Sequence, residues 1–487
     1  MSQYSRRAFL SLSAAFAATA AQADAPLSAL RPLARPNVPV MRPESPPVRA
    51  GWEDLVQNAG LGDGVAVKLV DMADGAVLWE RQSDAPMMPA STTKSVTTLY
   101  ALDKLGADHR FTTRLIATGP VVDGKVQGDL VLAGGGDPVL DTDALAGIAS
   151  DLAAAGVTGI TGGFLVWGGA LPYEEEIEPT QLDHLGYNPA VSGLNLNFNR
   201  VHFEWRRSGG AYATTFDARS ATRVPPVRLS TMRIVDRSLP VYTSEGPDRW
   251  TVARGALGGG GARWLPVRQP ALYAGEVFQT LAGAEGVTLP APRKITDLPE
   301  GTAIVSHDSP PLEQIAKGML LYSTNLTAEV LGLAASAVDG LPADIDASAA
   351  RMNAWIKTRF GVETGFKDHS GLSDENRVSA AQMVAMLTNA PERLRPLLKK
   401  IAIREAGGLY PGHVAAKTGT LNFVSTLAGY VTTSSGRELG FAIMTADEPA
   451  RERGKASGDE QPAGSISWNS RAKVFQDELL RRWSLMA

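Results

Sequence analysis

The pattern of apolar segments changes twice along the 487 residues of the chain, and this change constrains the fold more than any other feature. Both ends hold long apolar segments typical of strands and helices. About residues 113–298 instead consist of short alternating segments broken by glycine clusters, a pattern typical of small β-rich domains. A chain of this length fits roughly two or three domains at about 150 residues each. We therefore expect several domains of more than one kind.

The two ends predict one sheet flanked by helices. Asp74-Gly75 predicts the tight turn of a hairpin, because this pair tolerates a positive φ. A mostly apolar helix is expected next, and a closing amphipathic helix is expected to pack on the sheet near the C-terminus. The expected strands are residues 64–70, 76–80, 414–417, 426–433 and 439–445, and the expected helices are residues 91–105 and 470–485.

The first residues predict export. Arg6 and Arg7 precede an apolar run and the small-residue site Ala21-Gln22-Ala23, so residues 1–23 are interpreted as a cleavable signal peptide. The arginine pair is typical of the twin-arginine route, although general secretion signals also contain such pairs by accident. Residues 24–48 are rich in proline and predict an extended tether. No later run of about 18 apolar residues occurs, so we expect a periplasmic protein with no transmembrane anchor after signal cleavage.

Composition excludes several classes of site. The chain has no cysteine, which excludes disulfides, Cys-ligated zinc, iron–sulfur clusters, thiol catalysis and lipoprotein acylation. A net charge of -4 gives no basic footprint for nucleic acid. The six histidines are scattered without metal-ligand spacing, so we expect no metal and no cofactor.

Ser91-Thr92-Thr93-Lys94 places a hydroxyl and an amine on one face at the start of the expected helix. A serine hydroxyl is a poor nucleophile until a base removes its proton, and an amine kept neutral by burial can be that base. The start of a helix also leaves backbone N–H groups free for an oxyanion. Alone this spacing is weak, because it arises about once by chance in a chain of this size.

Two further short elements carry polar groups. Ser323-Thr324-Asn325 lies between two apolar stretches, where a loop leading into a helix is expected. A second Ser-x-Asn triplet, Ser467-Trp468-Asn469, is interpreted as turn material. Lys417-Thr418-Gly419-Thr420 occurs once, on an expected strand whose glycine lets a ligand approach the strand edge.

Ser-x-x-Lys, Ser-x-Asn and Lys-Thr-Gly in this order form the signature of active-site-serine penicillin-binding proteins and β-lactamases. The long gap between Lys94 and Ser323 makes the chain resemble the D-alanyl-D-alanine carboxypeptidase/endopeptidase family, peptidase family S13, of the penicillin-binding protein 4 type. Further matching segments are Pro89-Ala90, Phe111-Thr112-Thr113, Gly134-Gly135-Gly136-Asp137-Pro138, Asn195-Leu196-Asn197-Phe198-Asn199, Ser370-Gly371-Leu372-Ser373 and Leu421.

This resemblance implies an α+β multidomain fold. A penicillin-binding transpeptidase/β-lactamase-like domain, with an antiparallel sheet flanked by helices, would be interrupted by two smaller β-rich domains. The implied boundaries are residues 49–112 and 299–487 for the catalytic domain, 113–180 and 265–298 for inserted domain II, and 181–264 for inserted domain III.

The resemblance also implies roles and partners. Ser91 would be acylated by the penultimate D-alanine of a peptidoglycan peptide, with Lys94 as proton acceptor, and β-lactam antibiotics would be covalent inhibitors. Ser323 would pass a proton to the leaving amine, and Asn325 would bind the substrate amide. The remaining implied groups are Lys417 and Thr418 for the terminal carboxylate, Gly419 at the strand edge, and the backbone N–H groups of Ser91 and Thr420 for the oxyanion.

The sequence departs from the family at one place. Members that bind a diaminopimelate side chain use an acidic residue of the inserted region and an arginine directly after the Ser-Gly-Leu-Ser segment. Here Asp374 stands at the second place, with Arg377 three residues later, and Asp183 is the candidate for the acidic partner. Arg377 could compensate, the enzyme could favour another peptide, or Asp374 and Arg377 could be solvated loop charges.

Three other functions are weighed against this one. A β-lactamase shares the motifs, but no Glu-x-x-x-Asn lies in a compact segment between the first two to promote deacylation. A non-catalytic wall-binding scaffold is disfavoured by the intact motif residues. A Ser-His-Asp hydrolase is disfavoured because no serine lies in Gly-x-Ser-x-Gly.

Overall fold

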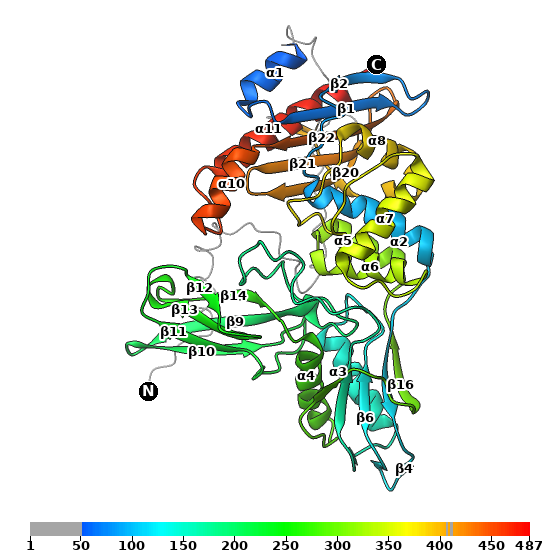
Figure 1. Cartoon of the computed structure of the whole chain (residues 1–487), viewed down its shortest axis with the longest axis vertical. Helices are drawn as coiled ribbons and strands as arrows, with labels where there is room; N and C mark the ends of the chain where they lie inside the picture. The colour runs from blue at the N-terminus through cyan, green and yellow to red at the C-terminus, as the bar shows by residue number, and fades with distance from the viewer. Residues whose placement is uncertain (1–50, 406–407, 410–412) are drawn as a thin grey trace, which may run out of the picture.

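The computed structural model describes residues 51–405, 408–409 and 413–487. The predicted signal peptide, residues 1–23, and the predicted tether, residues 24–48, lie outside the described residues. Figure 1 shows an elongated molecule, in which both ends of the chain (blue and yellow to red) build one part and the middle (cyan and green) builds the other.

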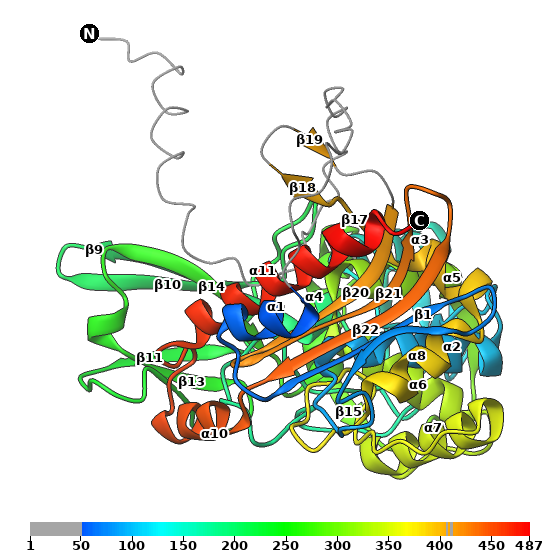
Figure 2. The ribbon, with the colours of Figure 1, turned by 90° about the horizontal axis from the view of Figure 1, so that it is seen from above.

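A six-stranded antiparallel sheet joins the two ends of the chain (Figure 2). Its strand order is β17-β20-β21-β22-β1-β2, and β1 pairs with β22 from Val65, opposite Thr445, to Asp71, opposite Leu439. The first strand of the chain therefore completes a sheet whose other long strands come last. These strands are β1 (Val65–Asp71), β2 (Val77–Arg81), β17 (Lys399–Ile401), β20 (His413–Leu421), β21 (Val424–Thr432) and β22 (Glu438–Ala446).

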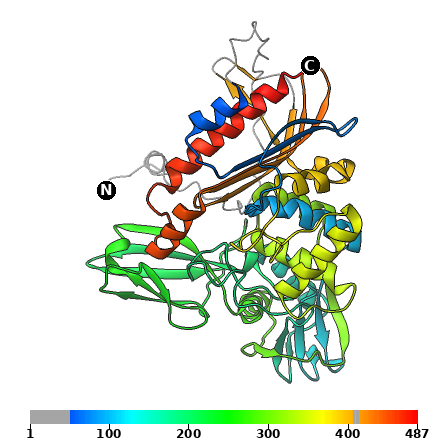
Figure 3. The same cartoon turned by 45° about the horizontal axis from the view of Figure 1, so that its top comes forward.

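Helices cover both faces of this sheet (Figure 3). One core, which includes Trp79, Phe441 and Trp483, packs beneath α1 and α11, and a second core packs beneath α2 and α5–α8. β21 lies between the two cores and is buried along almost its whole length. The helices are α1 (Trp52–Ala59), α2 (Thr93–Leu105), α5 (Leu312–Tyr322), α6 (Asn325–Ala337), α7 (Ile345–Phe360), α8 (Ala380–Thr388), α9 (Pro391–Leu394), α10 (Glu448–Ser457) and α11 (Ser465–Ser484).

The inserted region begins with a five-stranded sheet of order β15-β8-β6-β3-β16. Two long helices pack with this sheet around buried residues such as Phe164 and Phe278, whose rings lie in tilted aromatic contact. The elements are β3 (Thr112–Ala117), β6 (Leu130–Ala133), β8 (Phe164–Trp167), β15 (Arg293–Ile295), β16 (Thr302–Asp308), α3 (Thr142–Ala154) and α4 (Pro270–Ala284). A small sheet of β4 (Val121–Val122), β5 (Lys125–Val126) and β7 (Gly159–Ile160) lies beside it.

The region is built mainly of strands and differs from the expectation in two details. The region was expected to be β-rich, yet α3 and α4 are full helices: Asp141 caps the first by accepting from Ala144 N, and Pro270 begins the second. The predicted boundary after residue 298 cuts the sheet, because β16 pairs with β3 along residues 302–308. The five-stranded sheet therefore extends ten residues into the segment assigned to the catalytic domain.

The rest of the inserted region forms two three-stranded sheets, of order β10-β9-β14 and β11-β13-β12. Their buried residues Phe203 and Trp250 belong to the same core as Phe164 and Phe278, so the two inserted parts share their packing. The strands are β9 (Arg200–Ser208), β10 (Ala211–Asp217), β11 (Thr231–Val235), β12 (Tyr242–Ser244), β13 (Arg249–Ala253) and β14 (Gly260–Pro266). A further two-stranded pair, β18 (Arg404–Glu405) and β19 (Gly408–Leu409), lies near β17.

The element predictions at the two ends are confirmed within a few residues. The hairpin turns at Asp74-Gly75, with Gly75 at φ +74°, and the three C-terminal strands lie where expected. The closing helix begins at Ser465, five residues before its expected start. Ser467-Trp468-Asn469 therefore lies inside a helix and not in a turn, because buried Trp468 anchors the first turns of α11 to Phe423. Within the described residues, no helix is both long enough and apolar enough to cross a membrane.

We expect Trp483→Ala to lower the free energy of unfolding of the domain built from both chain ends by about 3–5 kcal/mol. Trp483 is fully buried on α11 and contacts Trp79 and Phe441 from strands at opposite ends of the sequence. Urea unfolding followed by tryptophan fluorescence and circular dichroism measures the change. Val474→Ala on the exposed face of the same helix, where the valine is 65% exposed, is the control and should change little. Equal effects of the two substitutions would contradict this account of the packing.

Candidate active site

Ser91 lies in a short 3-10 turn, η1 (Ala90–Thr92), that leads into α2. The residue before it, Ala90, has φ +47°, a left-handed conformation that costs free energy for a residue with a Cβ. Such a residue persists only where its surroundings fix it. The hydroxyl of Thr426 on β21 donates to Pro89 O at 2.7 Å, which ties the turn to the sheet.

Lys94 connects three distant segments of the chain. Its Nζ lies 2.9 Å from Ser91 Oγ, 2.7 Å from Asn325 Oδ1 on α6, and 2.6 Å from the carbonyl oxygen of Ser370 in the loop after α7. The side chain is completely buried. Burial lowers the pKa of Lys94 to about 7, although the charges of Asp368 and Glu329 oppose this shift. A large share of Lys94 is therefore neutral near pH 7.

The second motif contacts the first through Asn325 and Lys94. Ser323 ends α5 in a left-handed conformation, φ +62°, with its N–H donating to Met319 O, and Asn325 begins α6. The sharp turn at Ser323 directs its hydroxyl toward Lys417, whose Nζ donates to Ser323 Oγ at 2.8 Å. Burial, followed by the nearby charge of Lys94, lowers the pKa of Lys417 well below its usual value.

The third motif runs along β20 beside the Ser91 turn. A Cβ on Gly419 would lie 2.1 Å from Thr426 Oγ1 and 2.9 Å from the backbone N of Ser91, so only glycine fits there. Lys417 points into the protein, and Thr418 and Thr420 are exposed on the other side of the strand. The structure thus brings the three motifs together: Ser91, Lys94, Ser323, Asn325, Lys417, Thr418, Gly419 and Thr420.

Two buried carboxyls, Glu329 and Asp368, lie close enough to Lys94 for their charges to affect its pKa. The sequence analysis identified neither. Glu329 accepts from His369 N at 3.0 Å, and Asp368 accepts from Gly371 N and Ser373 N, each at 2.6 Å. Burial and the charge of Asp368 raise the pKa of Glu329 to about 8, and burial raises the pKa of Asp368 as well. One sequence signal was available for Glu329, since it is an acid in an apolar helix four residues after Asn325.

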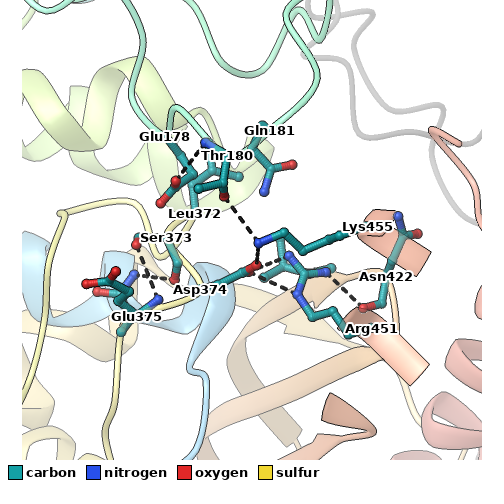
Figure 4. Close-up of polar contacts among 12 residues, drawn as sticks. Glu178, Thr180, Gln181, Leu372, Ser373, Asp374, Glu375, Asn422, Arg451 and Lys455 are labelled. Carbon is teal, nitrogen blue, oxygen red and sulfur yellow. Dashed lines mark hydrogen bonds and ion pairs between the residues drawn. The ribbon is translucent and has the colours of Figure 1, made fainter. Parts of the chain in front are cut away.

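Asp374, the residue that departs from the family pattern, is not a solvated loop charge. Figure 4 shows its carboxylate between two cations of α10. Asp374 Oδ1 accepts from Arg451 Nε at 2.9 Å, and Oδ2 accepts from Lys455 Nζ at 2.6 Å. Arg451 also donates to Asn422 O in the turn that follows β20, and Lys455 donates to Thr180 Oγ1 in the inserted region. The two cations therefore join α10 to three other segments: the loop that holds Asp374, the turn after β20, and the inserted region.

Beside this cluster lies a cavity of about 490 Å³. It is lined by Glu178, Thr180, Asp374, Glu375, Arg377, Glu452 and Lys455. Arg377 thus reaches the cavity, while its guanidinium also donates to Asp374 O and lies 3.6 Å from Glu448.

Asp183 is not brought into this cavity. Its side chain is exposed, and its backbone oxygen accepts from Arg268. The nearby Tyr187, not Asp183, reaches the motif residues, because Asn325 Nδ2 donates to Tyr187 O at 2.9 Å. Because every residue has a backbone carbonyl, a sequence motif cannot identify an acceptor of this kind.

No cluster of three or more histidine, cysteine, aspartate or glutamate side chains suited to a metal ion occurs in the part of the chain that the structure describes.

Several known proteins are similar to this chain in sequence or in fold. The D-alanyl-D-alanine carboxypeptidase of Actinomadura sp. (strain R39) is 28% identical over 452 residues, covering 82% of this chain and 80% of that protein. The crystal structure of penicillin binding protein 4 from Haemophilus influenzae matches with a TM-score of 0.70 at 20% identity, covering 89% of this chain and 99% of that one. The same protein complexed with a β-lactam matches with a TM-score of 0.68 at 19% identity.

The match to a family model extends over most of the chain. The model described as the D-Ala-D-Ala carboxypeptidase 3 (S13) family covers residues 49–463, so it includes all three motifs and the whole inserted region between the first two. The chain therefore belongs to the S13 family and is a serine-type D-Ala-D-Ala carboxypeptidase.

Proposed function

We propose that this enzyme is a penicillin-sensitive carboxypeptidase and endopeptidase that cleaves peptidoglycan stem peptides and cross-bridges through an acyl-enzyme on Ser91, in cell-wall remodelling. The hydrogen-bond arrangement at Lys94 carries the proposal. A neutral amine has two N–H donors and one lone pair. Asn325 Oδ1 and Ser370 O can only accept, so they take both donors. The lone pair is left for the Ser91 hydroxyl at 2.9 Å.

In the first half of the reaction, Ser91 Oγ bonds to the carbonyl carbon of the penultimate D-alanine while its proton passes to Lys94 Nζ. The backbone N–H groups of Ser91 and Thr420 stabilise the oxyanion. The close approach of Gly419 to Ser91 N supports this, because it brings the β20 backbone beside the turn. The C–N bond then breaks, and the leaving nitrogen takes the proton through the hydroxyl of Ser323.

The other groups of the cleft orient the substrate. Lys417 holds the Ser323 hydroxyl, and together with exposed Thr418 it binds the terminal carboxylate. Asn325 keeps one N–H of its amide for the substrate, since Nδ2 carries two and Tyr187 O accepts one. In the second half, water attacks the ester carbon while its proton passes to Lys94 Nζ. The bond from the carbon to Ser91 Oγ then breaks, and Lys94 returns the proton to Ser91 Oγ.

A β-lactam should form a long-lived adduct at Ser91. Rapid deacylation of such an adduct needs a carboxylate that can activate water. The carboxyls closest to Lys94, Glu329 and Asp368, are 0% and 1% exposed and are occupied by backbone N–H groups. This burial favours a penicillin-sensitive peptidase over a β-lactamase.

We further propose that the cavity beside Asp374 receives the side chain of the stem peptide, with Arg377 as one of its ligands. Arg377 lines this cavity together with acidic Glu178 and Glu452. Asp183 does not line this cavity, so its role in binding the side chain stays an untested prediction. The signal peptide predicted at residues 1–23 supports export by the twin-arginine route to the periplasm, where this substrate is found.

Incubation with a fluorescent penicillin and with a D-Ala-D-Ala pentapeptide tests the nucleophile. Wild type should retain the label and release D-alanine, whereas Ser91→Ala should do neither, because it lacks the attacking oxygen. Ser467→Ala, at the exposed serine of the second Ser-x-Asn triplet, is the control and should behave as wild type. Rapid loss of label without D-alanine release would favour a β-lactamase, and no label on folded wild type would favour a scaffold.

The pH dependence of acylation tests the base. Since only neutral Lys94 can accept the proton, the penicillin acylation rate should fall by about tenfold per pH unit below about 7 and level off above it. Lys94→Ala should lower the plateau rate by about 10²–10⁴-fold and should remove the acidic limb, because no amine is left to titrate. Appreciable labelling of folded Lys94→Ala at neutral pH would refute Lys94 as the base.

Arg377→Ala separates the cavity from the reaction itself. A penicillin lacks a stem-peptide side chain, so its acylation rate should stay within about twofold of wild type. The KM for a diaminopimelate-containing peptide should rise by about tenfold, which corresponds to loss of one charge-assisted hydrogen bond. Equal losses with both substrates would show that Arg377 acts on the cleft and not on the side chain.

A further inference from the structure

A segment of the inserted region, residues 175–188, brings its backbone to the second motif. It belongs to the connection that follows β8. Near its end, Tyr187 O accepts from Asn325 Nδ2 at 2.9 Å, while Asn325 Oδ1 accepts from Lys94 Nζ. Connections of this kind are more mobile than the elements that they join, unless other groups hold them. The orientation of the Asn325 amide therefore depends on what holds this segment.

Arg268, which lies between β14 and α4, holds the segment at three places along its backbone. Its Nη1 donates to Glu175 O at 2.7 Å and to Asn188 O at 2.9 Å. Its Nη2 donates to Asp183 O at 2.9 Å and to the Glu176 carboxylate at 3.1 Å. Each of these nitrogens carries two hydrogens, so all four are engaged. One side chain thus joins both ends and the middle of the segment.

Arg268 is itself firmly placed. The residue is only 4% exposed, and the carboxylate of Glu176 compensates the charge of its buried guanidinium. Its backbone N–H donates to Asp248 Oδ1 at 2.9 Å, and Asp248 is fully buried. Its backbone oxygen accepts from the Tyr173 hydroxyl at 2.8 Å. The guanidinium therefore extends from a fixed point of the inserted region.

Two other side chains of the segment make contacts of a different kind. Asn188 Oδ1 accepts from Glu178 N, and Asn188 Nδ2 donates to Glu178 O, each at 2.9 Å, so this amide joins the segment to itself. His184 Nε2 lies 3.2 Å from Glu460 Oε2, which belongs to the loop after α10. Arg268 differs from both because it ties the segment to the connection between β14 and α4, inside the inserted region.

We propose that Arg268 is a positioning residue for the active site: by holding the segment it keeps Tyr187 O in place, and Tyr187 O orients the amide of Asn325. The proposal rests on the proposed acylation of Ser91. Without this acceptor the amide is free to turn about its side-chain bonds. Lys94 then loses an oxygen partner that directs its lone pair toward Ser91, and the substrate loses an oriented N–H.

Arg268→Ala tests the inference. The second-order rate of acylation by a fluorescent penicillin should fall by about tenfold, the factor that corresponds to loss of one hydrogen bond. The rate of D-alanine release from a D-Ala-D-Ala pentapeptide should fall as well, because both reactions need the oriented amide. An acylation rate equal to that of wild type would overturn the proposal.

A double-mutant cycle with Asn325→Ala separates positioning from a general structural role. If Arg268 acts through Asn325, the two substitutions should not be additive. Arg268→Ala should then change the acylation rate of the Asn325→Ala enzyme by no more than about twofold. The same loss in both backgrounds would show that Arg268 acts on the cleft by another route, and this result would overturn the proposal.

Glu276→Gln is the matched control. Glu276 lies on α4 in the inserted region, and its two carboxylate oxygens accept from Arg228 N at 2.6 Å and Leu229 N at 2.8 Å. It thus joins a buried charge to loop backbone as Arg268 does, but its loop does not include Tyr187. Both variants should lower the thermal midpoint, and Glu276→Gln should keep its acylation rate within about twofold of wild type. If it loses as much as Arg268→Ala, a general loss of stability explains both results and the proposal fails.

Arg268→Lys serves in the same cycle if Arg268→Ala does not fold. Lysine keeps the charge beside Glu176, but its three hydrogens cannot replace four that lie in one plane. Its acylation rate should also be lower than that of wild type, and an equal rate would overturn the proposal. Labelled wild type with an unchanged rate in the Arg268 variants would overturn the role of Arg268 alone. Unlabelled wild type would overturn the proposed function together with the inference.

Discussion

The amine of Lys94 is the interaction on which the rest of the site depends. It is completely buried, and it is satisfied by three oxygens that come from η1, α6 and the loop after α7. An amine in that position costs free energy unless all three partners are present. The packing of α2 against α6 and of the loop against both is therefore a condition for keeping this amine buried, and burial favours its neutral form.

Close backbone contact provides the precision that such a site requires. At Gly371 and Gly419 even one extra carbon would collide with the turn that carries Ser91, so the loop and β20 lie directly against that turn. The same contact helps to hold Ala90 in its left-handed conformation, which would otherwise be costly. A side chain held by flexible neighbours could not point a lone pair at one hydroxyl, whereas one held between two backbones can.

The sequence predicted the motif residues because their side chains carry the chemistry, and it predicted the two-ended domain through the family resemblance. It did not predict Ser370 O or Tyr187 O, since any residue offers a backbone carbonyl and only the fold decides which one lies in the cleft. The pairing of Asp374 with α10 depends on a contact across 77 positions that no local pattern encodes. The helices α3 and α4 differ from these cases, because the sequence held signals for both. Asp141 is a typical capping residue and Pro270 a typical first helical residue, but the nearby glycine clusters favoured the prediction of a β-rich region.

The inserted region is part of the site rather than an addition to it. Asn325 Oδ1 accepts from Lys94 Nζ on α2, and Asn325 Nδ2 donates to Tyr187 O in the inserted region. These two hydrogen bonds together fix the orientation of the amide. A reversed amide would bring an N–H against the amine and an oxygen against a carbonyl, and both contacts would be repulsive. Lys455 reaches Thr180 of the same inserted segment while it holds Asp374. The insertion thus contributes to the orientation of Asn325, and through Asn325 it also constrains the base.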